Sequence, residues 1–247
     1  MIHDDDRLAA DLAARAGRQL LVLRAFGGDP DDLRQAGDRS SHDFLTAELA
    51  RHRPADAVLS EEGADDPARL AASRVWIVDP LDGTREFGEP GRTDWAVHVA
   101  LWEKDHLTAG AVALPAQGEV LSTADPVAPS SPSSSGTLRM VVSRSRPPAF
   151  VTRLADETGA EVVPLGSAGA KAAAVIRGSA EVYVHDGGQY EWDSAAPVAV
   201  ALAAGLHASR IDGSKLVYNQ AVPSVPDILI CQAALADMLL EAISSVR

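Results

Sequence analysis

The stretch Asp79-Pro-Leu-Asp-Gly-Thr84 follows directly on the apolar run 75–78, which predicts a buried strand. Its proline has no backbone donor and a fixed φ, so we expect it to stop the strand ladder and turn the chain. The carboxylates of Asp79 and Asp82 would then converge at the carboxyl end of the strand, with the Thr84 hydroxyl as an N-cap. An ordinary Asp-Pro turn is the equally weighted alternative from this local pattern alone.

Two further acidic clusters also lie at the ends of predicted elements. Ser60-Glu-Glu-Gly63 follows the short apolar run 57–59, and Glu191-Trp-Asp193 precedes a helix expected from about Ser194. Taken alone, each is typical of solvated acids or of a helix N-cap. Together, three carboxylate clusters suggest one site for hard cations such as Mg²⁺ or Mn²⁺, and such sites can hold two ions ~3.5–4 Å apart.

These motifs resemble those of a known family. Asp79-Pro-Leu-Asp-Gly-Thr84 and Trp192-Asp-Ser-Ala-Ala196 are similar to the two signature motifs of the inositol monophosphatase superfamily of magnesium-dependent, lithium-inhibited phosphatases, and Glu61-Glu-Gly63 resembles its intervening acidic motif. Thr84-Arg-Glu-Phe87 and residues 213–219 resemble the CysQ branch, above all its actinobacterial form. The resemblance implies a hydrolase that removes the 3′-phosphate from 3′-phosphoadenosine 5′-phosphate, giving AMP, in sulfate assimilation.

The resemblance also implies two or three Mg²⁺ ions per site and names their ligands. The first ion would bind Glu61, Asp79 and the Leu81 carbonyl; the second would bind Asp79, Asp82 and Asp193; a third, weaker ion would bind Asp38. Thr84 and Asp38 would polarise the attacking water, with Glu61 beside them. The chemistry implied is in-line hydrolysis of a monoester by a metal-activated water. Li⁺ would inhibit it at the second metal position.

Substrate contacts are carried over from the same resemblance. Backbone N–H groups of Gly83 and Thr84 would hold the phosphate, and Arg144, Ser167 and Lys171 would contact the nucleoside. Lys171 stands in an otherwise apolar stretch, and its alternative is to snorkel to solvent. Arg144 and Arg146 have the alternative of being surface charges.

Other branches of the superfamily remain open as alternatives. Asp186, seven residues before Asp193, matches the acid that inositol monophosphatases use toward inositol hydroxyls. Arg85 stands where the CysQ branch commonly has Lys, and His185 where it often has Arg. An inositol monophosphatase, a fructose-1,6-bisphosphatase or a broad-specificity enzyme is therefore the nearest alternative. A non-catalytic metal-binding regulatory protein is a more distant one.

Composition limits the partners of the chain. The 247 residues include 22 basic and 35 acidic side chains, a net charge of −13 that would repel a nucleic-acid polymer. No apolar run reaches the ~18 residues of a membrane span, and the single Cys231 cannot form an internal disulfide. We therefore expect a cytoplasmic protein that binds a small phosphorylated substrate. A homodimer is implied by the resemblance only.

The apolar pattern predicts a mixed fold of helices and strands. A helix is expected over 6–26, ended by Gly27-Gly-Asp-Pro30, and a second from Ser40 with a capping box to Asp43. Strands are expected over 57–59, 75–78 and 95–101, where His98 is expected on a polar face or as a satisfied histidine. After a Pro/Ser-rich loop over 125–136, strands at 138–142, 161–163 and 181–184 alternate with helices at 148–157, 167–177 and from 194.

Combined with the resemblance, this pattern implies the α+β fold of the sugar phosphatases, a layered αβαβα sandwich. We expect an N-terminal α+β half, residues 1–136, that carries most metal ligands. A C-terminal α/β half, residues 137–247, would carry Asp193 and the substrate contacts. The active site would lie in the cleft between the halves.

Overall fold

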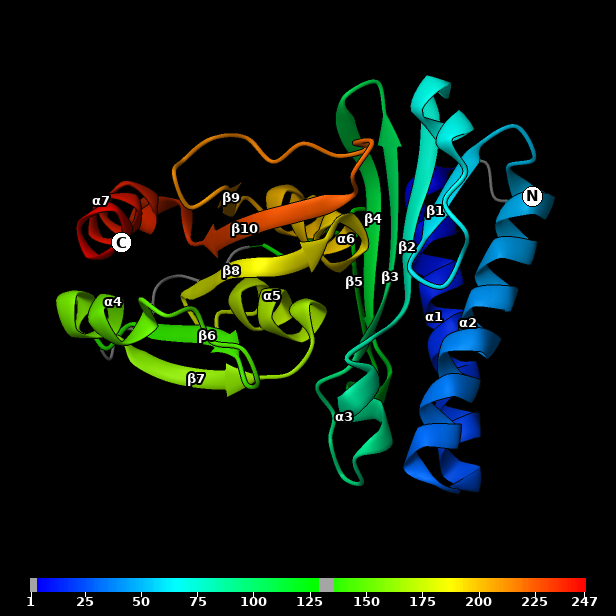
Figure 1. Ribbon diagram of the computed structural model, residues 1–247, viewed down its shortest axis with the longest axis horizontal. Coiled ribbons are helices and arrows are strands. Elements are labelled where there is room, and N and C mark those ends of the chain that lie inside the picture. Colours follow the sequence, from blue (N-terminus) through cyan, green and yellow to red (C-terminus); the bar gives the residue numbers. More distant parts are fainter. Residues whose placement is uncertain (1–3, 129–135) are drawn as a thin grey trace.

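The computed structural model describes residues 4–128 and 136–247 and stacks its elements in five layers (Figure 1). Helices α1 (Asp5–Phe26) and α2 (Pro30–His52) cover the outer face of a first sheet. Helices α5 (Ala168–Ile176) and α6 (Glu191–Ala203) lie between this sheet and a second one. Helices α4 (Val151–Thr158) and α7 (Ala236–Val246) cover the far face of the second sheet. The predicted αβαβα sandwich is therefore confirmed.

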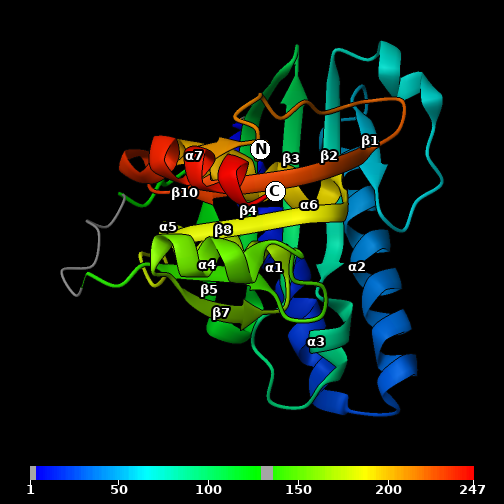
Figure 2. The ribbon, with the colours of Figure 1, turned by 60° about the vertical axis from the view of Figure 1, so that its left-hand side comes forward.

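Each sheet has five strands, and each draws them from its own part of the chain (Figure 2). The first has the order β1-β2-β3-β4-β5, parallel between β1 and β2 and antiparallel elsewhere. Its strands are β1 (Ala57–Ser60), β2 (Arg74–Asp82), β3 (Ala96–Glu103), β4 (His106–Leu114) and β5 (Glu119–Ser122). The second has the order β7-β6-β8-β10-β9, and its strands are β6 (Arg139–Ser143), β7 (Glu161–Leu165), β8 (Val182–Tyr190), β9 (His207–Ser209) and β10 (Ser224–Cys231).

Strand alternation explains why both sheets are buried on both faces. In β2, Trp76 and Val78 face α1 and α2, whereas Val75 and Ile77 face the central helices. The same alternation in β8 sends Tyr183 toward the central helices and the residues before and after it toward α4 and α7. The central core is continuous across both sheets, so α5 and α6 join the two parts of the chain.

The second helix begins ten residues earlier than its pattern predicts. Asp29 is the N-cap of α2, and its Oδ1 accepts hydrogen bonds from Asp31 N (2.9 Å) and Asp32 N (3.4 Å). Ser40 lies inside the helix, so the predicted capping box from Ser40 to Asp43 is wrong. The dipeptide Asp29-Pro30 starts this helix rather than only ending the one before, because proline suits the first helical position.

Strand β2 also continues further than predicted. Pro80 does not end the strand; the ladder with β3 instead shifts register, so that Asp79 pairs with His98 and Asp82 with Ala96. This irregularity absorbs the residue that cannot donate to the ladder. Both aspartates therefore stay on the sheet, at the same end.

The start of helix α6 and the Pro/Ser-rich loop are two further places to compare with the predictions. Helix α6 begins at Glu191 rather than Ser194, which places Asp193 in its first turn. The Pro/Ser-rich loop predicted over 125–136 lies mostly outside the described residues, since 129–135 are not described. Short helical turns at Thr84–Gly88 (α3), Pro67–Ala71, Pro115–Gln117 and Ala233–Leu235 connect the elements. Among the described helices, none is long and apolar enough to cross a membrane.

Candidate active site

A cavity of about 200 Å³ opens where the end of β2 meets the second sheet. Elements from both parts of the chain line it: the turn into α3, the segment after β6, the start of α5, β8 and the first turn of α6. The predicted site residues on its wall are Asp82, Gly83, Thr84, Ser167, Lys171 and Asp193. Its other lining residues are Arg85, Glu86, Ser143, Ser145, Arg146, Gly166, Ala168, His185 and Gln189.

Three aspartates form a compact cluster beside this cavity. One oxygen each of Asp79, Asp82 and Asp193 lies within 4.8 Å of the other two. Asp79 is fully buried, and its Oδ1 accepts a hydrogen bond from Leu81 N at 3.0 Å. Its Oδ2 has no hydrogen-bond partner among the described residues. A buried acceptor without a donor, facing other carboxylates, fits a hard divalent cation.

The electrostatics of the cluster favour such a cation. Burial, together with the charges of Glu61, Asp82 and Asp193, raises the pKa of Asp79 well above its usual range. Crowding by protein atoms and the charge of Asp193 raise the pKa of Glu61 to about 7, although its side chain is still open to solvent. Burial and the charge of Asp82 raise the pKa of Asp193 to about 6. The protein thus holds uncompensated negative charge here.

The pKa of Asp82 is shifted in the opposite direction to those of the neighbouring carboxylates, because His98 lies beside it. The His98 Nε2 atom lies 3.1 Å from Asp82 Oδ2, and Gly169 N donates to the same oxygen at 2.7 Å. Burial alone would raise the pKa of Asp82, but His98, Lys171 and the Gly169 N–H lower it to about 2. His98 Nδ1 lies 3.0 Å from the Trp192 carbonyl, so one imidazole connects β3 with the start of α6.

The contact of His98 with Asp82 was not predicted from the sequence. The alternation of β3 predicted a histidine on a polar face or one satisfied within the fold, and the structure buries it completely. His98 pairs with Asp79 across the sheet, which brings it to the acidic cluster, and that register is not visible in the sequence.

The Thr84 hydroxyl lies between Asp38 and β2. Its Oγ1 donates to Leu81 O at 3.0 Å and lies 3.2 Å from Asp38 Oδ1. Thr84 is not the predicted N-cap, because Gly83 occupies that position with a left-handed backbone and no side-chain bond. Burial and the charge of Glu62 raise the pKa of Asp38 to about 6. The structure thus places Asp38 next to Thr84.

Lys171 is buried rather than snorkelling to solvent, so that alternative is wrong. Its side chain is 3% exposed, and its Nζ donates to Ser167 O at 2.8 Å and also to Gly166 O. Burial lowers its pKa to about 8, against the opposing effect of Asp82 and Asp193. Ser167 is the N-cap of α5, and its Oγ accepts from Ala170 N. Both residues line the cavity.

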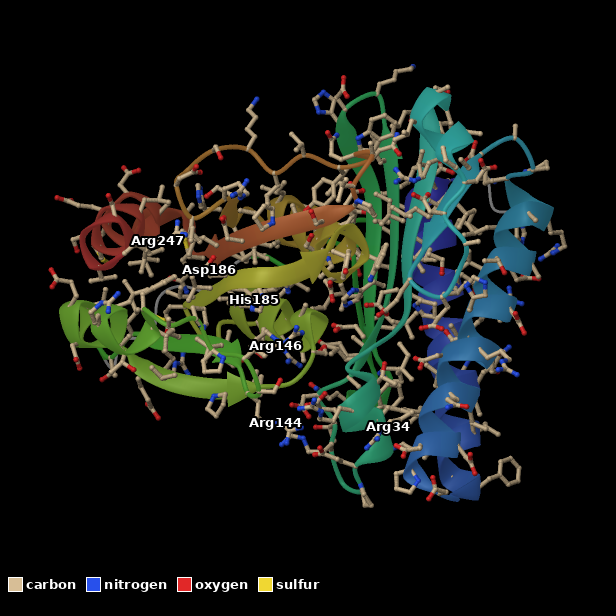
Figure 3. All side chains as sticks on the ribbon, viewed as in Figure 1. Arg34, Arg144, Arg146, His185, Asp186 and Arg247 are labelled. Atoms are coloured by element: carbon tan, nitrogen blue, oxygen red, sulfur yellow. The ribbon has the colours of Figure 1, made fainter. Side chains whose placement is uncertain are left out.

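Two predicted substrate contacts are not brought to the cavity (Figure 3). Arg144 forms ion pairs with Glu86 (2.5 Å) and Glu89 (3.0 Å), because it points toward α3. Asp186 lies on β8 within 3.7 Å of Arg247 at the chain end. Arg146 lines the cavity instead, and it has no ion-pair partner within the described ranges 4–128 and 136–247.

Comparison with known proteins agrees with this arrangement. The model of the inositol monophosphatase family matches residues 8–247, nearly the whole chain. The chain belongs to the inositol monophosphatase family. A Mycobacterium bovis protein named 3′-phosphoadenosine 5′-phosphate phosphatase is 54% identical over 238 residues, which cover 93% of this chain and 89% of that protein. A Mycobacterium leprae protein of the same name is 50% identical over 98% of this chain and 94% of its own length.

Solved structures of family members share the fold. CysQ from Bacteroides thetaiotaomicron superimposes with a TM-score of 0.81 at 25% identity, covering 94% of this chain and 98% of that one. The inositol monophosphatase of Thermotoga maritima gives a TM-score of 0.76 at 20% identity, covering 97% and 96% of the two chains. The layered sandwich is therefore the fold of this family.

The raised pKa values predict how Mg²⁺ changes stability with pH. Because Asp193 and Glu61 titrate higher in the folded than in the unfolded chain, the metal-free fold binds extra protons between about pH 4 and pH 7 and loses stability as pH rises through that window. For Asp193, a pKa of about 6 against 3.8 corresponds to roughly 3 kcal/mol. At ~2–4 °C per kcal/mol, we expect the melting temperature without metal to fall by at least about 4 °C.

Scanning calorimetry with EDTA or with Mg²⁺, at pH 4.5 and pH 7.5, measures this effect. The gain in melting temperature from Mg²⁺ should be clearly larger at pH 7.5. An equal gain at both pH values would show that the clustered carboxylates do not hold the cation.

Proposed function

We propose that this protein is a Mg²⁺-dependent phosphatase that removes the 3′-phosphate from 3′-phosphoadenosine 5′-phosphate and releases AMP. The observation that carries the proposal is one cavity lined by both carboxylates and cationic side chains. Asp82 and Asp193 contribute the carboxylates, and Lys171 and Arg146 contribute the cations. The names of the mycobacterial relatives support the same substrate.

The acidic cluster is suited to hold the metal. Asp79, Asp82 and Asp193, joined by Glu61 and the Leu81 carbonyl, are the proposed ligands, and Asp38 is proposed for a third ion. Bound there, Mg²⁺ would neutralise phosphoryl charge and lower the pKa of a water molecule. Neighbouring groups orient the proposed ligands: His98 and the Gly169 N–H fix the orientation of Asp82. Thr84 Oγ1 and Asp38 Oδ1 lie 3.2 Å apart, and we propose that the two side chains orient the attacking water.

Arg146 favours a bisphosphate over a monophosphate substrate. Its guanidinium faces the cavity without an acidic partner among the described residues, so it is available for a second phosphate. The acid that would suit inositol hydroxyls, Asp186, is turned toward Arg247. An inositol monophosphatase activity is therefore the weaker alternative for this cavity.

Phosphate release from three substrates tests the proposed function. The value of kcat/KM should be highest for 3′-phosphoadenosine 5′-phosphate. It should be lower by at least about tenfold for inositol 1-phosphate, which has no second phosphate, since hydrogen bonds to a charged group are worth ~1.5–3 kcal/mol each. It should also be lower for fructose 1,6-bisphosphate, which has a second phosphate but no nucleoside. Millimolar Li⁺ should inhibit the reaction, as proposed for the second metal position. Equal rates on all three substrates would replace this proposal with a broad-specificity phosphatase.

Two further features belong to the proposal. We propose a cytoplasmic location, which the single, buried Cys231 supports because it implies no dependence on disulfides. We also propose a homodimer, on similarity to the family alone. Gel filtration with light scattering measures the latter directly.

A further inference from the structure

Two buried side chains on β8 present unused hydrogen-bond acceptors where they line the cavity. His185 is 3% exposed and Gln189 is 6% exposed, and both line its wall. His185 Nδ1 and Gln189 Oε1 have no hydrogen-bond partner among the described residues. Nearly all buried polar atoms of folded proteins have a partner, so two such atoms on one cavity wall call for a ligand.

The other polar atom of each side chain fixes its orientation. His185 Nε2 donates to the Gly187 carbonyl at 2.7 Å, and Gln189 Nε2 donates to the Tyr183 hydroxyl at 2.8 Å. With its proton on Nε2, the neutral His185 ring has a free lone pair on Nδ1. Both free atoms are therefore acceptors, and the matching ligand groups are hydrogen-bond donors.

His185 and Gln189 are four residues apart on β8, so strand alternation places both on the side that Tyr183 also faces. Gly187 and Gly188 have φ values of 81° and 74°, in the left-handed region that other residues rarely adopt. They lie where the pairing with β10 shifts register. His185 and Gln189 share the cavity wall, whereas Asp186, on the other side of the strand, faces Arg247.

The surroundings keep His185 neutral. Burial lowers its pKa, and the nearby charges of Lys171 and Arg146 lower it further. A neutral ring retains the Nδ1 acceptor at physiological pH. Lys171 and Arg146 thus also help to keep His185 Nδ1 available as a hydrogen-bond acceptor.

We propose that His185 and Gln189 determine which leaving group the cavity accepts, by receiving hydrogen bonds from donor groups of the nucleoside. The donors available on this substrate are the ribose 2′-hydroxyl and the adenine 6-amino group. The proposal rests on the proposed function, because it concerns the leaving group of that reaction. A substrate without the donor leaves a buried acceptor unpaired, which a site built for that donor rejects.

Two substrate analogues test the proposal and separate the two donors. The 2′-deoxy analogue of 3′-phosphoadenosine 5′-phosphate lacks the hydroxyl, and the inosine analogue has a carbonyl in place of the amine. For the wild-type protein, kcat/KM should fall at least about tenfold for one analogue or both, relative to the parent nucleotide. The analogue that is rejected identifies the donor.

Variants show whether these two side chains cause the rejection. In His185→Phe or Gln189→Met, the parent should lose its advantage, so that parent and rejected analogue react within about threefold of each other. His185→Asn, which keeps a polar atom near the Nδ1 position, should retain part of the discrimination. Gln232→Met is the matched control: Gln232 is also buried with an unpartnered Oε1, but it lies outside the cavity wall. This control should keep the wild-type ratio.

The outcomes separate this inference from the proposed function. Wild-type turnover of the parent, with both analogues hydrolysed equally well, would overturn this inference alone. The same holds if both cavity variants keep the wild-type discrimination. No turnover of the parent nucleotide would overturn the proposed function and, with it, this proposal.

Discussion

Replacing Asp79 with asparagine is expected to lower kcat/KM by at least about 10³-fold while leaving the protein folded. The carboxylate lies at the centre of the acidic cluster, with one oxygen buried and without a hydrogen-bond donor among the described residues. A metal acting as Lewis acid supplies several kcal/mol of transition-state stabilisation, and each ~1.4 kcal/mol is a factor of ten in rate. Losing a central ligand removes most of that contribution.

The same substitution should not destabilise the metal-free fold. Asparagine retains the oxygen that accepts from Leu81 N, and it removes a charge whose repulsion with Glu61, Asp82 and Asp193 raises the pKa of Asp79. We expect a melting temperature in EDTA equal to or above that of the wild type, and a much smaller gain from added Mg²⁺. Asp212→Asn serves as the control, since this exposed acid accepts hydrogen bonds only from Ser214 among the described residues. Near-wild-type turnover by Asp79→Asn would contradict the assignment of the site.

Replacing Arg146 with alanine is expected to lower kcat/KM for 3′-phosphoadenosine 5′-phosphate by roughly 10- to 100-fold. The expected loss corresponds to ~1.5–3 kcal/mol for hydrogen bonds to a charged group. The loss should appear mainly in KM, because the second phosphate is remote from the bond that breaks. Adenosine 3′-phosphate, which has no second phosphate, should be hydrolysed at the wild-type rate by this variant.

The neighbouring arginine provides the matched control. Arg144 is paired with Glu86 and Glu89, so Arg144→Ala should change both substrates by the same factor. Arg146→Lys should recover part of the preference, since it keeps the charge without the two-pronged geometry. Equal losses on both substrates in Arg146→Ala would argue that the residue has no role in binding the second phosphate.

The acidic part of the site could be predicted from sequence because its residues lie in short, dense motifs. Asp79 and Asp82 follow an apolar run and Asp193 precedes one, and the structure gathers the three within 4.8 Å. The layer order was likewise predictable, since strand and helix periodicities differ and the family resemblance fixes their arrangement.

The cationic and acceptor parts of the site depend on register, which the sequence does not reveal. Arg144 and Arg146 are two residues apart in the segment after β6. Arg144 nevertheless pairs with α3, whereas Arg146 lines the cavity. On β8, His185 lines the cavity and the adjacent Asp186 faces Arg247, and the sequence does not show which face of this strand borders the cavity. Short sequence motifs therefore predicted the carboxylate cluster, whereas the side chains proposed for substrate selection depend on how the strands pack.

Identification of the reaction products tests directly which phosphate is removed and whether its removal requires Mg²⁺. Metal-free protein is mixed with 3′-phosphoadenosine 5′-phosphate, and ³¹P NMR follows the reaction before and after Mg²⁺ is added. If the 3′-phosphate lies at the carboxylates and the 5′-phosphate at Arg146, adenosine 5′-phosphate and inorganic phosphate should form only once Mg²⁺ is present. Formation of adenosine 3′-phosphate, or hydrolysis at the same rate in EDTA, would contradict it.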